Sequence, residues 1–213
     1  MTTGRQILAI TLMVFLPEIL FGQIISGIGF KSGLAYSTYY YVIDPGLESP
    51  FWRFGFTAGI FAEGLRNKDF SLQLEADFEQ KGGNHKQHSD DPDRYFTLNM
   101  LSIPITARIF LLHRNIKPYL GAGPRVDIFL SKNDFAVMPL FPQHRSLTFG
   151  GTIVAGVQFK LSGRYLAILE ASYSPDFTGF MDYQHTDPNV DGIITRNAAW
   201  ELKTGILFDM AKK

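Results

Sequence analysis

The stretch FSLQLEADFEQK, residues 70–81, alternates apolar and polar side chains over twelve positions without a break. Because successive side chains of a β-strand point to opposite faces, this stretch predicts a strand with one apolar face and one highly charged face. Alternation alone leaves two architectures open. A water-soluble barrel buries the apolar face, whereas a transmembrane barrel turns that face to lipid and encloses the polar face in its lumen.

Length and composition restrict the class of protein. The chain has 213 residues, a formal net charge of zero and no cysteine. This length suits one domain with a substantial core, and the neutral charge gives no electrostatic reason to expect a nucleic-acid partner. Without cysteine the chain forms no disulfides and has neither a thiolate nucleophile nor a Cys-ligated zinc site.

The first 22 residues have the pattern of a secretory signal peptide. Arg5 precedes a short apolar run over residues 7–16, which is too short to cross a bilayer as a helix. We expect cleavage after Gly22, which divides the chain into a signal peptide, 1–22, and one mature domain, 23–213. No later segment is apolar over the roughly 18 residues that a membrane helix needs, so entry into a membrane requires a β-barrel.

The same alternation recurs along the mature chain and predicts eight strands. Their approximate ranges are 27–40, 52–63, 70–81, 95–110, 117–130, 148–161, 165–174 and 198–210. Phe61 is a bulky apolar residue on the polar side of the second strand, and the seventh strand is the least regular because Leu166 and Ile168 share a face with Glu170. Pro104 and Pro124 each remove a backbone donor, which predicts a β-bulge at one or both.

The connections between these strands alternate between short and long. Short ones lie near Arg66, Arg114 and Ser162, whereas long ones cover about 42–51, 82–94, 132–146 and 175–196. Outer-membrane barrels show this asymmetry, with tight periplasmic turns and extended extracellular loops. The pattern therefore predicts an all-β fold: an eight-stranded antiparallel up-and-down transmembrane β-barrel in the outer membrane of a Gram-negative bacterium.

Side-chain size indicates which face lies inside. An eight-stranded barrel has an interior just wide enough for side chains, and the apolar face carries too many large residues to fit. The polar face combines glycines with nearly balanced charges, and buried charges are tolerated when they are paired. We therefore expect a salt-bridged lumen network of Lys31, Arg53, Glu63, Glu75, Asp77, Glu79, Arg108, Arg125, Asp127, Lys160, Glu170, Glu201 and Lys203.

Aromatic residues gather near the predicted strand ends, where membrane interfaces favour them. At the extracellular ends these are Tyr39, Tyr40, Tyr41, Phe51, Trp52, Tyr95, Phe96 and Trp200, and at the periplasmic ends Phe30, Phe110, Phe159, Tyr165 and Phe208. We interpret them as two aromatic belts.

Four segments resemble the PorT-like, or "porin family", outer-membrane β-barrel family of Bacteroidota. They are FGFTAGIFAEG (54–64), FSLQLEADFEQKG (70–82), LSIPITARI (101–109) and KPYLGAGPRVDIFL (117–130). The resemblance spans nearly the whole mature chain and implies an eight-stranded barrel made from a secreted precursor. It implies no reaction, although a few members are linked to protein secretion or gliding machinery.

No motif in the sequence predicts catalysis, a cofactor or a metal. His85, His88, Asp90, Asp91 and Asp93 share a loop but match no metal motif, and 187–192 lacks the ligand pattern of a calcium loop. His144 or His185 combined with Asp134, Asp182 or Ser174 could be drawn as a catalytic set, yet no spacing selects one. We expect a protein that is not an enzyme.

The long loops carry an apolar run, FAVMPLFP, at residues 135–142, and further large residues at 177–183. Exposed apolar patches mark partner surfaces, although these residues could instead cap the barrel mouth. We expect the docking surface for another envelope protein to include Phe135, Met138, Leu140, Phe141, Phe180 and Tyr183. The sequence thus favours a structural or partner-docking barrel in contact with outer-membrane lipid, with a small porin-like channel and an outer-membrane enzyme as alternatives.

Overall fold

A computed structural model describes residues 25–41, 52–85, 94–112, 114–134, 145–183 and 193–210. The expected signal peptide lies outside these ranges, so its cleavage site stays a prediction. Within them, no helix is both long and apolar enough to cross a bilayer. The described residues form the strands β1 (Ile25–Tyr41), β2 (Arg53–Gly64), β3 (Phe70–His85), β4 (Arg94–Phe110), β5 (Ile116–Asp134), β6 (Leu147–Ser162), β7 (Tyr165–Pro175), β8 (Met181–Tyr183) and β9 (Ile193–Asp209).

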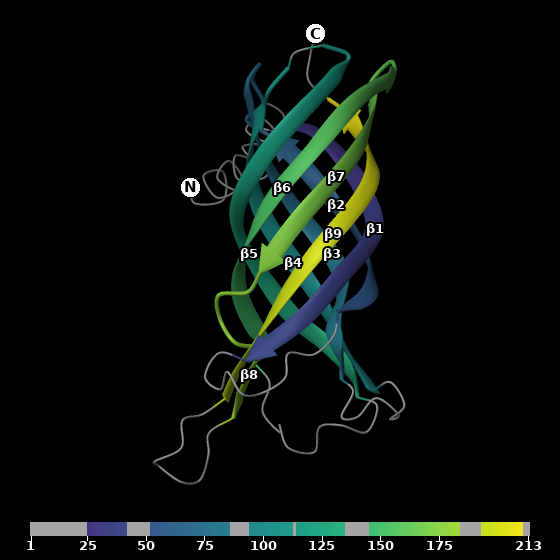
Figure 1. The fold of residues 1–213 in the computed structure, drawn as a ribbon. Helices are drawn as coiled ribbons and strands as arrows, with labels where there is room; N and C mark the ends of the chain where they lie inside the picture. Colours follow the sequence, from purple (N-terminus) through teal and green to yellow (C-terminus); the bar gives the residue numbers. More distant parts are fainter. Residues whose placement is uncertain are drawn as a thin grey trace, which may run out of the picture.

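The sheet closes into a barrel, because β9 pairs with β1 as well as with β7 (Figure 1). Eight long strands follow one another around the wall in chain order, and each of them is antiparallel to both of its neighbours. The three-residue strand β8 pairs with the start of β9. The predicted eight-stranded antiparallel up-and-down barrel is therefore confirmed.

The two ends of the barrel differ in their connections. Residues 65–69, 111–115 and 163–164 join β2 to β3, β4 to β5 and β6 to β7 at one end, where Gly27 also pairs with Asp209. We call this the short-turn end. The connections 42–52, 86–93, 135–146 and 176–192 meet the opposite, long-loop end. In an outer-membrane barrel the short turns face the periplasm and the long loops face the cell exterior.

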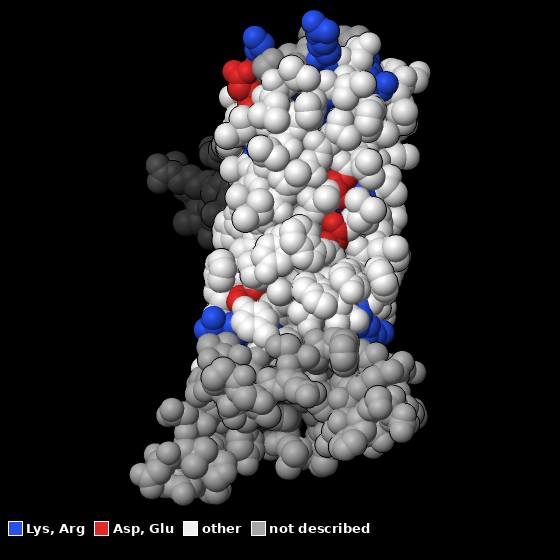
Figure 2. All heavy atoms as spheres, viewed as in Figure 1, with Lys and Arg blue, Asp and Glu red and all other residues white. Residues whose placement is uncertain are grey.

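The polar face of each strand points into the barrel. In β3, Glu75, Asp77 and Glu79 are at most 3% exposed, whereas Leu74 and Phe78 on the other face are 49% and 36% exposed. In β2 and β9 the residues of the apolar face are likewise the more exposed ones, and in Figure 2 most of the visible wall between the two ends is uncharged, with a few Asp or Glu atoms showing near mid-height. The apolar-out arrangement inferred from side-chain size is thus the one observed.

The two prolines interrupt strand pairing without producing the predicted bulges. In the β3–β4 ladder, pairing stops after Leu74 and Ile105 and resumes at Asp77 and Ser102 in the same register, so Pro104 falls in the gap. The β4–β5 ladder has an equivalent gap opposite Pro124. Each proline lacks a backbone N–H donor, so the strands lose pairing locally, but their register does not change. The bulge of this sheet region lies instead between Asn99 and Met100.

Aromatic pairs line parts of the outer wall near both ends. Tyr36 stacks on Trp52 with ring centroids 5.0 Å apart near the long-loop end, and Tyr165 meets Phe208 at 5.5 Å near the short-turn end. Two residues assigned to the belts are exceptions. Tyr39 is 3% exposed and Phe110 is 4% exposed, because both lie on the inward face of their strands.

Candidate functional site

Most residues of the predicted lumen network are buried inside the barrel, so the lumen is the candidate site. Those that are at most 7% exposed are Lys31, Glu63, Glu75, Asp77, Glu79, Arg108, Arg125, Asp127, Glu170, Glu201 and Lys203. They come from seven of the eight wall strands, because each strand places alternate residues on the inner face.

Lys31 of β1 and Arg108 of β4 meet the same acids in the short-turn half of the lumen. The Lys31 Nζ lies 2.9 Å from Glu75 Oε1 and 2.6 Å from Glu170 Oε1. Arg108 Nη2 lies 3.4 Å from Glu170 Oε2, and its Nη1 lies 3.7 Å from Glu63 Oε2. Each cation therefore serves at least two carboxylates across the lumen, and this cross-linking compensates for the cost of burying the charges.

Lys203 of β9 extends this cluster toward the long-loop end. Its Nζ lies 3.4 Å from Glu75 Oε2, 3.0 Å from Asp77 Oδ2 and 3.0 Å from Glu201 Oε2. Glu75 thus bridges two lysines from neighbouring strands. Gly59 makes room for Asp77, because a Cβ built at this glycine would collide with the Asp77 carboxylate and with the backbone of Ala76.

A second cluster fills the long-loop half. Lys81 Nζ lies 2.6 Å from Asp127 Oδ2 and 3.2 Å from Glu79 Oε2. Arg125 Nε lies 3.1 Å from Asp127 Oδ1, and its Nη2 donates a hydrogen bond to Asp176. Lys81 and Asp176 were not among the predicted residues of the network. Lys81 has the inward parity of β3, whereas Asp176 follows the last residue of β7 and had no parity to assign it.

Two residues that were predicted to belong to the lumen network are not buried in the lumen. Lys160 is exposed near the short-turn end, beside the β6–β7 register shift between Lys160 and Ser162, so its expected place in the buried lumen is wrong. Arg53 is half-buried at the start of β2. Arg66 was not predicted, yet it joins the network from the β2–β3 turn, with its Nε 3.2 Å from Glu63 Oε1.

An apolar cluster occupies the short-turn half beside these charges. We call Phe61, Leu166, Ile168 and Leu207 the short-turn cluster; all four are at most 6% exposed. Lys31 Nζ lies 5.1 Å from the centre of the Phe61 ring, a cation–π contact that joins the cluster to the ion network. The sequence carried a signal for this cluster, since all four are large apolar residues on the polar face of their strands.

Tyr119 connects a second apolar group to the network. Its ring packs on Phe110 with centroids 5.9 Å apart, and both residues cluster with Val154. The Tyr119 hydroxyl donates a hydrogen bond of 2.6 Å to Glu170 Oε2. Gly156 of the adjacent strand leaves the space that the phenol ring fills, because a Cβ there would overlap it.

Another apolar cluster lies at the opposite end. We call Tyr39, Leu98, Met100 and Phe180 the long-loop cluster; all are at most 3% exposed. Phe180 does not belong to a strand. Its segment, residues 176–180, leaves β7 and is held by a 2.9 Å hydrogen bond from Phe180 N to Thr195 O and by the contacts of Asp176 with Arg125 and Asn197 N. Phe177 N also donates a 2.8 Å hydrogen bond to Phe149 O of β6, so the segment fills the wall between β6 and β9 beyond the end of β7, and Phe180 is buried in the long-loop cluster.

Phe180 therefore contradicts its predicted exposure in a docking surface. Its ring is only 2% exposed, since it packs in the long-loop cluster and not on the surface. This position agrees with the other alternative that the sequence allowed, in which these apolar residues close the barrel mouth. Phe135, Met138, Leu140 and Phe141 lie outside the described residues, as does the side chain of Tyr183. Their docking role stays a prediction.

The residues considered for catalysis or metal binding are placed only in part. Ser174 is 2% exposed inside the barrel, with its Oγ 3.1 Å from Thr152 Oγ1. His144, His185, residues 86–93 and residues 187–192 lie outside the described residues, and the side chains of His85, Asp134 and Asp182 are likewise not described. The described residues contain no group of three or more His, Asp or Glu side chains arranged to hold a metal.

Comparison with known proteins gives one family and a set of similar folds. The model of the outer membrane protein beta-barrel domain matches residues 21–182. The crystal structure of the outer membrane protein OprG from Pseudomonas aeruginosa aligns with a TM-score of 0.59 at 12% identity, covering 88% of this chain and 97% of OprG. Neisserial surface protein A aligns with a TM-score of 0.50 at 20% identity, covering 87% and 98%. The search of curated proteins gave no match.

Proposed function

The chain belongs to the outer membrane protein beta-barrel domain family, and from this premise we propose that it is a closed, non-conducting outer-membrane barrel that anchors its long loops for docking to another envelope protein. Localisation in the outer membrane follows from the family and from the folds that resemble this one. The non-conducting lumen and the docking role are the proposed parts.

The filled lumen is the observation that supports closure. Lys31, Arg108, Glu75 and Lys203 line the lumen of an eight-stranded barrel, yet none of these side chains is more than 4% exposed to solvent. Charged residues that line a water-filled channel stay hydrated, whereas these residues contact one another. A narrow barrel whose inner side chains are dry provides no continuous path for ions.

Reconstitution in planar bilayers tests this part of the proposal. We expect the purified protein to give no stable current steps, because the ion network occupies the lumen. A barrel of the same family with an open lumen serves as the positive control for insertion. Reproducible steps of constant size from this protein would replace the proposal with the porin-like channel.

The docking role rests on the loops and on the resemblance seen in the sequence. The apolar run at 135–142 follows β5 at the long-loop end, which places its point of attachment on the exterior side. The PorT-like resemblance adds a class of partner, a component of secretion or gliding machinery. Phe180 no longer belongs to the docking surface, because it packs inside the barrel.

Replacing Phe135, Leu140 and Phe141 with serine tests docking. We expect the triple variant to assemble as wild type does but to lose the envelope proteins that cross-link to it in native outer membranes. Serine at the exposed residues Leu111 and Leu112 of the short-turn end is the matched control. Retention of the same cross-linked proteins by the triple variant would rule out docking through this run.

A further inference from the structure

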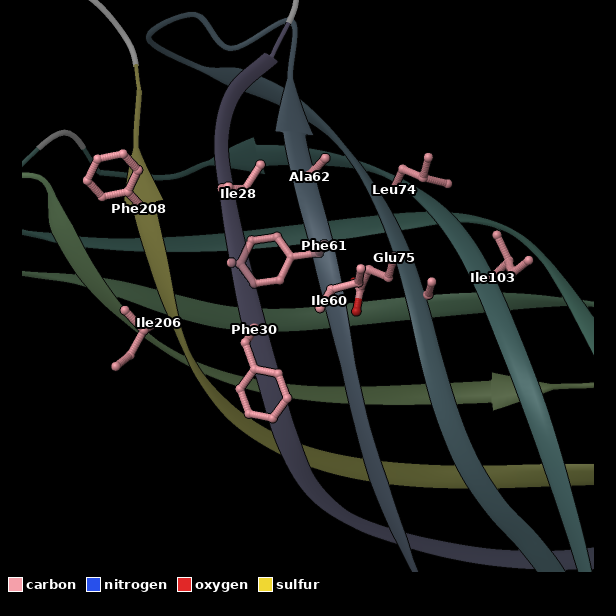
Figure 3. Close-up of a pocket in the computed structure, with 12 residues that line it drawn as sticks. Ile28, Phe30, Ile60, Phe61, Ala62, Leu74, Glu75, Ile103, Ile206 and Phe208 are labelled. Atoms are coloured by element: carbon pink, nitrogen blue, oxygen red, sulfur yellow. The ribbon is translucent and has the colours of Figure 1, made fainter.

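The lipid-facing wall carries a groove near the short-turn end. Its volume is about 750 Å³, and its lining comes from β1, β2, β3, β4 and β9 (Figure 3). This volume lies within the roughly 300–1,000 Å³ of clefts that hold small ligands. Most of the lining is apolar, and the outward residues Phe30, Ile60 and Ile206 are between 51% and 66% exposed.

The register of the strands explains the hollow. One row of outward residues across neighbouring strands contains Phe208, Ile28, Ala62 and Leu74. The next row contains Ile206, Phe30, Ile60 and Ala76. Each row thus has one alanine among large side chains, and the alanines lie on adjacent strands. Their small side chains leave a depression that the larger neighbours border.

Gly29 forms part of the floor of this groove. A Cβ at this position would overlap the Phe61 ring, which belongs to the short-turn cluster. The glycine therefore lets an inward aromatic ring lie directly beneath the wall at the base of the groove, and Figure 3 shows this ring between β1 and β2. The groove therefore results from the packing of the wall, and the Phe61 ring fills the space beneath it.

The groove lies in the periplasmic half of the membrane. Ile28 is three residues from the start of β1, Ala62 is two residues from the end of β2, and Phe208 is the penultimate residue of β9. At about 3.3 Å per residue, the distance from these positions to the strand ends at the short-turn end is less than half the thickness of the hydrocarbon core, which is roughly 30 Å. The groove is thus in contact with the phospholipids of the inner leaflet.

The rim next to the groove is rich in cations. Among the described residues, the short-turn end carries Arg66, Lys68, Arg114, Lys117, Lys160 and Arg164 against Asp69 and Asp209, and Figure 2 shows blue side chains at this end. Lys68 is exposed in the turn between β2 and β3. Arg164 is exposed beside the end of β9, since its carbonyl accepts a 2.8 Å hydrogen bond from Asp209 N. Both cations therefore lie at the barrel end nearest the groove, next to the ends of strands that line it.

We propose that the groove and the cations beside it form a binding site for an anionic phospholipid of the inner leaflet. An acyl chain lies in the groove over Ala62 and Ala76, and the phosphate pairs with Lys68, with Arg164 adding to the attraction. The apolar groove supplies the chain contact, and the excess of cations selects the negative headgroup.

Native mass spectrometry tests the site. The protein is released from nanodiscs that contain equal amounts of phosphatidylglycerol and phosphatidylethanolamine, and the retained lipids are counted. We expect phosphatidylglycerol to exceed phosphatidylethanolamine by about fivefold for each cation engaged. Lys68→Ser should lower this preference, whereas Ala62→Phe should fill the groove and lower retention of both lipids.

Two matched variants provide the controls. Arg114→Ser removes an exposed cation from the β4–β5 turn, and Ala155→Phe enlarges an outward residue of β6, which does not line the groove. Both should retain lipid as wild type does, and heat modifiability on gels establishes that every variant is folded. Equal retention of the two lipids by wild type, or equal effects of Ala62→Phe and Ala155→Phe, would overturn the site. Release of the protein as a lipid-free dimer would assign the groove to a second copy instead.

Discussion

The two ends of the lumen are closed by different means. The short-turn cluster consists of Phe61, Leu166, Ile168 and Leu207, which all belong to long wall strands. The long-loop cluster takes three residues from wall strands and completes itself with Phe180, which belongs to the segment 176–180. One closure is therefore made by long paired strands alone, and the other depends on a short segment that hydrogen-bonds to β6 and β9 beyond the end of β7.

This difference has an energetic consequence. A residue such as Leu207 leaves the lumen only when the pairing of β9 with β1 and β7 breaks, which is global unfolding. Phe180 leaves when a few hydrogen bonds and the contact of Asp176 with Arg125 are lost. Local opening has a lower free energy where fewer contacts hold a segment. The exterior end is therefore the one that single substitutions should open.

Arg125→Ala should give the largest effect. It leaves Asp127 and Asp176 without their shared cation, and loss of one partner in a buried ion pair costs about 3–5 kcal/mol. Segment 176–180 should be released as a result. Because the chain has no cysteine, Met100→Cys provides a single reporter thiol in the long-loop cluster, and its labelling rate should rise at least about tenfold.

The matched reporter is Leu207→Cys in the short-turn cluster. Its labelling rate should not change with Arg125→Ala, because the wall strands still hold that end closed. Acceleration at both reporters would mean that the two closures open together. In that case the distinction between them would be lost.

Phe61→Ala tests the short-turn end. Removal of a buried phenyl ring leaves a cavity and should lower the free energy of unfolding by about 3 kcal/mol. The labelling rate at Leu207→Cys should change far less than Arg125→Ala changes it at Met100→Cys, because the strands remain paired. Urea unfolding from lipid vesicles measures the stability. Rapid labelling at Leu207 in this variant would show that side-chain packing, and not strand pairing, keeps the end closed.

The fold followed from the sequence because a strand in a barrel obeys one simple rule. Alternation over residues 70–81 separates lipid-facing from lumen-facing side chains, and the alternating loop lengths identify the two ends. The bulge was misplaced because the effect of a proline depends on both neighbouring strands. Pro104 leaves a gap in one ladder, and the register continues past it.

The same alternation predicts the charged residues in the lumen, but it does not predict the positions of residues at the ends of the barrel. Alternation assigns Glu75 or Lys203 to the interior, whereas the role of Lys160 depends on how far β6 extends beyond the membrane. Asp176 and Phe180 lie past the end of β7, where no parity applies. Their inward position results from three-dimensional contacts with Arg125 and Tyr39, which local sequence does not encode.

Phe180→Ala isolates the cap from the ion pair. The variant keeps Asp176 on Arg125 but removes the ring from the long-loop cluster, and it should lower the free energy of unfolding by about 2 kcal/mol, since a short segment beyond the end of β7 can shift to refill part of the space. Labelling at Met100→Cys should rise, though less than with Arg125→Ala. Phe177→Ala is the control, because Phe177 is 61% exposed in the same segment. Equal effects of the two alanines would show that Phe180 contributes nothing specific to the cap.

Tyr119→Phe should have the smallest effect and tests one hydrogen bond of the lumen network in the short-turn half, where Tyr119 pairs with Phe110 at the end of β4. The substitution keeps the ring against Phe110 and removes the 2.6 Å hydrogen bond to Glu170, which Lys31 and Arg108 still contact. A lost hydrogen bond to a charged partner that keeps its other contacts should cost about 1 kcal/mol. Neither reporter thiol should label faster, because this bond belongs to the network inside the barrel and holds neither end. A loss as large as that of Phe61→Ala would instead place Tyr119 among the residues that close the short-turn end.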